Sequence, residues 1–213
     1  MDKAFDYGDL FGRAWEIFRQ NAVTMVIVTL LAGGFALLVT SLAGQISTRL
    51  DNLVPVLITG PLSVGFFLMS LRAARGRKVG FGDFTEAFPL AGQSIVLHII
   101  FTVFATIGFI ICVLPMFFVI ALYLPVYLFL IEDRRGFWHA MESSRKFVLD
   151  NFLPWLLLAF IYIALNIVGL VLCLVGSLVT FPVSTLMVVL AYDQQRNARF
   201  ATADTDEPAP PAM

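Results

Sequence analysis

The segment Asn151–Tyr192, NFLPWLLLAFIYIALNIVGLVLCLVGSLVTFPVSTLMVVLAY, decides the fold because it contains no Asp, Glu, Lys or Arg. One helix needs roughly 20 apolar residues to cross the hydrocarbon core of a membrane, so this run holds two spans and a turn. Charged residues make up 14% of the chain, against about 25% in soluble domains. The segment therefore predicts a transmembrane hairpin.

Three other charge-free runs extend this prediction along the chain. The runs 20–48 and 52–71 each fit one span, and the run 87–131 fits two. We therefore expect an all-α, polytopic transmembrane bundle, with residues 1–196 as the membrane domain. The chain end at 197–213 is rich in Ala, Pro, Asp and Thr and predicts a disordered cytoplasmic tail. The six predicted spans are 22–44, 53–72, 92–113, 115–131, 152–173 and 176–192.

The distribution of basic residues predicts the orientation. With six spans, all 14 Lys and Arg residues except Arg49 fall on the side that carries both termini and the loops 73–91 and 132–151. Basic residues close to span ends are retained in the cytoplasm. We therefore expect a multi-pass protein of the bacterial inner (plasma) membrane with cytoplasmic N- and C-termini.

Two similar seven-residue segments suggest an internal repeat. LITGPLS at Leu57–Ser63 and LVTFPVS at Leu178–Ser184 share Leu, Thr, Pro and Ser in the same register. Amphipathic stretches begin near Tyr7, Phe81 and Phe137, each with large apolar residues at helical spacing. These features predict three hairpins, each preceded by an interfacial amphipathic helix and related by a pseudo-threefold axis. The alternative is that the matches arose by chance, because membrane helices are built from similar residue types.

Four prolines predict where helices start or bend. Pro61, Pro115 and Pro182 each stand near the predicted start of the second helix of a hairpin, where the missing proline N–H is not needed. Pro125 falls inside the fourth predicted span. It should kink that span because it removes an internal hydrogen bond.

Two polar residues inside the spans are candidate functional groups. His98 and Asn166 interrupt apolar runs, and an ionisable residue at that depth is a functional hypothesis by default. The competing interpretation is structural, since each side chain can hydrogen-bond to a neighbouring helix. Apart from Arg72 at the last position of the second predicted span, no Asp, Glu, Lys or Arg lies inside a predicted span, so His98 has no charged partner at its depth for a proton relay.

A basic cluster follows the second span. Arg72, Arg75, Arg77 and Lys78 serve first as the topology signal, and such clusters also attract anionic lipid headgroups. We therefore expect these residues to contact membrane lipids.

Metal and redox chemistry have little support. His139 and Glu142 share a helix face, but a metal site would need further inward carboxylates, and the chain has 2 His in all. Cys112 and Cys173 fall near predicted outer hairpin tips, where a disulfide is chemically permitted; they could instead face lipid or a helix. We expect no cofactor, no bound metal and no catalytic residue.

The chain resembles a group of bacterial six-span membrane proteins related to the membrane domain of glycerophosphoryl diester phosphodiesterases. Three segments carry the resemblance: GPLSVGFFLMSLRAARGRKVGFGDFTEAF, EDRRGFWHAMESSRKFVLDNFLPWLLL and LVLCLVGSLVTFPVSTLMVVLAY. The resemblance implies a six-span fold but supplies no catalytic residue. The sequence departs from the group at the fourth span, where LPMFFVIALYLP lacks the usual Pro-Gly and nearby basic residue.

Three functional hypotheses follow. The first is a non-catalytic scaffold, assembly or lipid-organising protein, with lipids and another membrane protein as partners and no nucleic acid. The second is a transporter or channel for a lipid or small apolar solute, which a groove lined by Phe and faced by His98 or Asn166 would favour. The third is an enzyme using the carboxylates of Asp83, Glu86, Glu132 and Glu142.

The predicted topology can be tested with reporter fusions. A reporter that is active only in the cytoplasm should be active at both ends of the chain, because the basic residues are retained on that side. A fusion at Asn52, in the predicted outer loop, is the control and should be inactive. A periplasmic signal from either terminus would contradict the topology.

Overall fold

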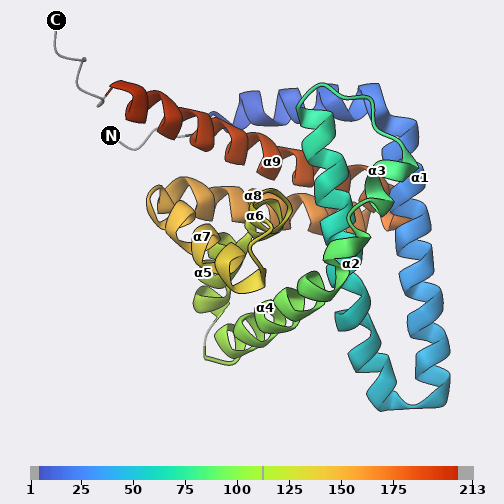
Figure 1. Cartoon of the computed structure of the whole chain (residues 1–213). Helices are drawn as coiled ribbons and strands as arrows, with labels where there is room; N and C mark the ends of the chain where they lie inside the picture. Colours follow the sequence, from blue (N-terminus) through green and yellow to red (C-terminus); the bar gives the residue numbers. More distant parts are fainter. Residues whose placement is uncertain (1–4, 112, 206–213) are drawn as a thin grey trace, which may run out of the picture.

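The computed structural model describes residues 5–111 and 113–205, without the side chains of 48–52, 111, 113, 114, 173, 174 and 201–205. The described residues form helices joined by short connections, with no strand among them (Figure 1). The elements are α1 (Tyr7–Ile46), α2 (Thr48–Ala74), α3 (Phe81–Thr85), η1 (Phe88–Leu90), α4 (Ala91–Ile111), α5 (Val113–Tyr123), α6 (Val126–Asp133), α7 (Phe137–Leu149), α8 (Phe152–Val171) and α9 (Cys173–Thr205).

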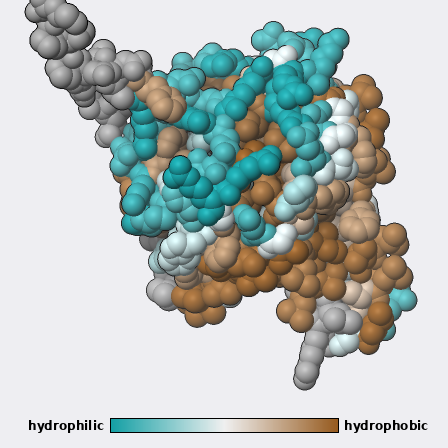
Figure 2. Space-filling view, in the orientation of Figure 1, coloured by the Kyte–Doolittle hydropathy of each residue, from teal (hydrophilic) through white to brown (hydrophobic). Residues whose placement is uncertain are grey.

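Six stretches of helix are long and apolar enough to cross a membrane, and each coincides with one predicted span. They are α1, α2, α4, the α5–α6 pair, α8 and α9. The prediction of an all-α bundle with six spans is therefore confirmed, and the chain has the character of a multi-pass membrane protein. Hydrophobic residues cover the lower part of the face shown in Figure 2, and hydrophilic residues gather above them.

The six spans pack in a ring in chain order. α1 packs on α2, α4 on α5 and α8 on α9; α2 also contacts α4, α5 contacts α8, and α9 contacts α1. The second member of each pair is the more buried one. We compare the fraction of buried residues in an apolar stretch of 18 residues from each span. This fraction is 44% in α2, 44% in α5–α6 and 61% in α9, against 11%, 17% and 28% in α1, α4 and α8.

The first amphipathic stretch continues into the first span as one bent helix. Asp6 caps α1 by accepting hydrogen bonds from the backbone N–H groups of Gly8 and Asp9. Further along, Asn21 has φ −119° and ψ 15°, and this single non-helical residue bends α1 (Figure 1). The apolar face differs in part from the predicted one, since Leu10, Ala14 and Phe18 are buried whereas Phe11 and Trp15 are exposed.

The other two amphipathic stretches are also helical. Phe84 of α3 is buried, while Phe81 and Phe88 on either side of it are half-exposed. In α7, the buried residues are Ala140, Met141, Ser144, Phe147 and Val148, and Trp138 is exposed. The position of these helices at a membrane interface stays a prediction.

The proline prediction is partly wrong. Pro61 and Pro182 lie inside α2 and α9, not at helix starts, because each helix begins earlier, at the hairpin turn before its apolar run. Pro115 does lie in the first turn of α5. Pro125 ends the turn between α5 and α6, so the predicted break in the fourth span is present.

The close packing of α2 on α4 depends on Gly60. A Cβ atom on Gly60 would lie 2.5 Å from the backbone oxygen of Ser94 in α4. The two backbones can therefore approach this closely only because residue 60 has no side chain.

The start of the predicted tail is helical. α9 continues to Thr205, past the predicted boundary at 197, and residues 206–213 lie outside the described part of the chain. A contact explains this extension: Arg199 pairs with Asp150 at 2.6 Å and lies over the ring of Phe147, 4.4 Å from its centroid. The last turns of α9 are thus held against the end of α7.

One ionic cluster joins the ends of the three more buried spans. Arg75, one residue beyond α2, contacts Glu132 of α6 at 2.5 Å and Asp193 of α9 at 2.9 Å. The other oxygen of Glu132 accepts hydrogen bonds from Tyr192 at 2.5 Å and from Arg196. The hydrogen bonds to Asp193 and Glu132 raise the pKa of Arg75. We call these five residues the three-helix junction.

Replacing Glu132 by Gln should destabilise the protein. The change leaves Arg75 and Arg196 without their shared carboxylate, and only 13% of the Glu132 side chain is exposed. We therefore expect the unfolding free energy to fall by about 1–3 kcal/mol. Denaturant unfolding in mild detergent measures this. The control is Glu142→Gln, because the ion pairs of Glu142 among the described residues are with Arg145 and Lys146 of its own helix, α7. Equal stability of the two variants would contradict the structural role of the junction.

Replacing Gly60 by Ala should also destabilise the bundle. The added methyl group would overlap the backbone of α4, which we expect to lower the unfolding free energy by about 1–3 kcal/mol. Gly34→Ala is the matched control, since a Cβ atom there meets nothing within 4 Å. Alanine favours helix over glycine, so the control should be at least as stable as the wild type in the same unfolding measurement.

Candidate functional site

Two adjoining cavities lie between the spans. The first has a volume of about 330 Å³ and is lined by residues of α1, α2, α8 and α9, among them Asn166; we call it the Asn166 cavity. The second has a volume of about 230 Å³ and includes His98; we call it the His98 cavity. Thr59, Ser63 and Phe181 line both, so the two cavities share a wall.

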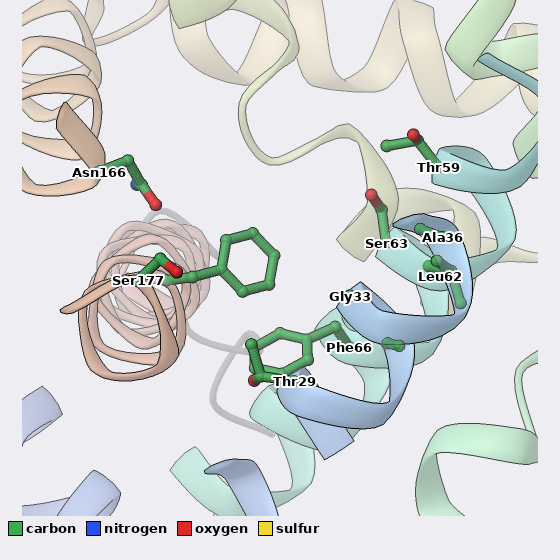
Figure 3. Close-up of a pocket in the computed structure, with 11 residues that line it drawn as sticks. Thr29, Gly33, Ala36, Thr59, Leu62, Ser63, Phe66, Asn166 and Ser177 are labelled. Atoms are coloured by element: carbon green, nitrogen blue, oxygen red, sulfur yellow. The ribbon is translucent and has the colours of Figure 1, made fainter. Parts of the chain in front are cut away.

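The Asn166 cavity carries a few neutral polar groups on apolar walls. The Asn166 side chain points toward the cavity from α8, across from Ser63 and Thr59 of α2 (Figure 3). Its amide nitrogen donates hydrogen bonds to the carbonyl of Tyr162 at 2.7 Å and to Ser184 at 3.0 Å. Asn166 therefore bridges α8 and α9 while also lining the cavity.

The His98 cavity is built around two ring side chains. Nδ1 of His98 lies 3.1 Å from the hydroxyl of Tyr127 in α6. Tyr127 is also hydrogen-bonded to Ser63 and stacks on Phe67, with ring centroids 5.4 Å apart. These contacts join α2, α4 and α6 around the cavity. His98 thus has a neutral partner on a neighbouring helix and also lines a cavity.

A lateral groove lies on the outside of the first hairpin. It has a volume of about 510 Å³ and is enclosed by α1, α2 and the segment from α3 to η1. Phe81, Phe84 and Phe88 form its third wall. Ala32 and Leu62 line both this groove and the Asn166 cavity, so these two spaces also share a wall and the three spaces adjoin one another.

Among the residues that the structure describes, none that lines these three spaces is Asp, Glu, Lys or Arg. The available chemistry is therefore neutral hydrogen bonding from Thr, Ser, Asn, Tyr and His, surrounded by Phe and aliphatic side chains. Pockets of a few hundred Å³ with mostly apolar walls and a few placed polar groups are typical of small-molecule sites. This arrangement fits an uncharged or largely apolar ligand.

The four residues of the predicted lipid-binding cluster have different environments. Arg72 contacts Asp83 at 2.5 Å and Glu86 at 2.6 Å, and Arg75 belongs to the three-helix junction. Arg77 and Lys78 are exposed in the connection that leads to α3. The predicted contact with lipid headgroups therefore rests mainly on Arg77 and Lys78.

The carboxylates considered for an enzyme have separate partners. Asp83 and Glu86 share Arg72, Glu132 lies in the junction, and Asp133 is 3.5 Å from Nε2 of His139. Hydrogen bonds from Arg145 and Lys146 lower the pKa of Glu142 to about 2. Among the described residues, no three His, Cys, Asp or Glu side chains form a group that could hold a metal ion.

The possible disulfide is not described by the structure. Cys112 lies outside the described residues, and the side chain of Cys173 is not described. Their pairing stays a prediction.

Comparison with known proteins identifies no relative. No protein-family model, no curated protein and no solved structure matches the chain. The resemblance to the membrane domain of glycerophosphoryl diester phosphodiesterases is thus without support from these comparisons, and the functional argument rests on the geometry of the cavities.

Proposed function

We propose that the protein is a non-catalytic multi-pass membrane protein that binds a lipid or small apolar solute between its helices and moves it through the membrane. One observation carries the proposal: the lateral groove, the Asn166 cavity and the His98 cavity adjoin one another through shared lining residues. The described lining residues include no Asp, Glu, Lys or Arg, which disfavours ions and permits an apolar cargo. This supports the transport hypothesis over the scaffold hypothesis.

A scaffold or assembly role is the second candidate, and exposed aromatic residues favour it. Trp138 of α7 is 71% exposed, and Phe11 and Trp15 of α1 are 43% and 40% exposed. Large aromatic residues are common in the centres of protein interfaces. A partner membrane protein could bind there.

The finer architecture is part of the same proposal. We infer three hairpin repeats in a bacterial inner membrane with cytoplasmic termini. The higher buried share of α2, α5–α6 and α9 supports the repeat, because the second helix of each hairpin faces inward. The basic residue distribution supports the orientation.

Filling the shared wall of the two central cavities should block binding. Thr59 lines both cavities, and its hydroxyl donates to the carbonyl of Pro55 in its own helix, so Thr59→Phe adds bulk and gives up a bond within α2. Purified wild-type protein should retain a small organic molecule detectable by mass spectrometry after solvent extraction. Thr59→Phe should retain at least about tenfold less, since the ring occupies the space of the ligand.

Leu38→Phe is the control for the added ring. Leu38 is 60% exposed on α1 and lines none of the three spaces, so this variant should retain the same molecule in wild-type amount. Equal retention by wild type and Thr59→Phe, or an empty wild-type protein, would show that the central cavities hold no cargo.

A further inference from the structure

The lateral groove is held open by contacts within the protein. Phe84 lies directly on α2 at Gly65, where an added Cβ atom would come within 2.9 Å of the Phe84 ring. Phe84 is therefore buried as an anchor, while Phe81 and Phe88 beside it remain 54% and 48% exposed along the groove. In Figure 1, α3 lies between α1 and α2, and its residues Phe81 and Phe84 line the groove.

Polar contacts keep α3 in this position. Arg72 at the end of α2 donates hydrogen bonds to Asp83 of α3 at 2.5 Å and to Glu86 at 2.6 Å. The backbone N–H of Val79 donates to the side chain of Asn21 at the bend of α1, at 3.4 Å. The segment around α3 is thus attached to both helices of the first hairpin.

Two basic residues lie in the connection that leads to the third wall of this groove. Arg77 and Lys78 are exposed and precede Phe81 by four and three residues. Arg72 forms ion pairs with both nearby carboxylates, Asp83 and Glu86. The Arg77 charge adds to the effect of Arg72 in lowering the pKa of these two carboxyl groups. An apolar groove is therefore combined with an exposed basic pair directly before its third wall.

We propose that the lateral groove binds an acyl chain of an anionic phospholipid, whose headgroup lies at Arg77 and Lys78. An acyl chain suits walls made of Phe, Leu, Ile, Val, Ala and Pro side chains, and its volume need not fill the whole groove of about 510 Å³. Basic residues close to a membrane surface attract anionic headgroups. The combination of the two features selects an anionic lipid over a zwitterionic lipid or a free apolar solute.

This inference goes beyond the proposed function. Binding in the groove requires no movement of cargo and no occupancy of the central cavities. The groove and the Asn166 cavity share Ala32 and Leu62, so a lipid bound here is also next to the path of the proposed cargo.

The experiment measures lipid binding to the full-length protein in detergent by native mass spectrometry. The two probes are phosphatidylglycerol and phosphatidylcholine with identical acyl chains. Wild type should bind phosphatidylglycerol more tightly, and Arg77→Gln with Lys78→Gln should reduce that preference by about fivefold for each charge removed. The matched control is Arg134→Gln with Arg135→Gln, which removes two exposed charges distant in sequence from α3 and should leave the preference unchanged.

A second variant tests the acyl-chain site independently of charge. Leu57 is 45% exposed, lines the groove and does not line either central cavity, so Leu57→Trp should weaken binding of both lipids at least about fivefold. Thr59→Phe, which fills the central cavities, should leave phosphatidylglycerol binding intact. Equal affinity of wild type for the two lipids, or unchanged binding by Leu57→Trp, would overturn the proposal whether or not the central cavities hold cargo.

Discussion

The contact of Arg75 with Glu132 and Asp193 is the constraint on which the arrangement of the bundle depends. One guanidinium joins the ends of α2 and α6 to Asp193 of α9, just after the charge-free run of that helix, and these are the spans with the largest buried share. A largely buried carboxylate needs a cation, so the three helix ends are held in one register. The central cavities lie between the same helices, at Thr59, Phe181 and Tyr127. The cavities therefore lie in a bundle whose inner helices are joined by ion pairs at one end and by apolar contacts elsewhere.

The number of spans was predictable from the sequence, whereas the helix starts were not. Hydropathy marks which residues lie in an apolar environment, so the runs around Asn166 and His98 each predicted two spans. A helix can extend beyond the apolar run that it contains. α2 and α9 therefore begin at the hairpin turns and include Pro61 and Pro182 in their interiors. Neighbouring helices and Ser or Thr side chains make such prolines tolerable in membrane helices.

The candidate site was predictable only in part. His98 and Asn166 were identifiable because polar residues are rare in apolar runs, but Ser63, Thr59 and Tyr127 are common residue types without such a signal. The partners of the basic cluster were also hidden. Arg75 is hydrogen-bonded to Asp193, which follows it by 118 positions in the chain, and no local pattern links two residues so far apart. Tertiary packing alone determines which arginine is used inside the protein and which remains exposed.

The first segment of the chain packs against the last hairpin, and this sets the order of assembly during synthesis. The hydroxyl of Tyr7 donates to the carbonyl of Pro154 at 3.1 Å, and the ring of Phe5 packs edge-on against Trp155, 5.6 Å between centroids. Leu10, Ala14 and Phe18 are likewise buried in the finished protein. While the ribosome is still making α8, Tyr7 and Phe5 lack these two partners. The ring of spans therefore closes only after translation of α9, which packs on α1.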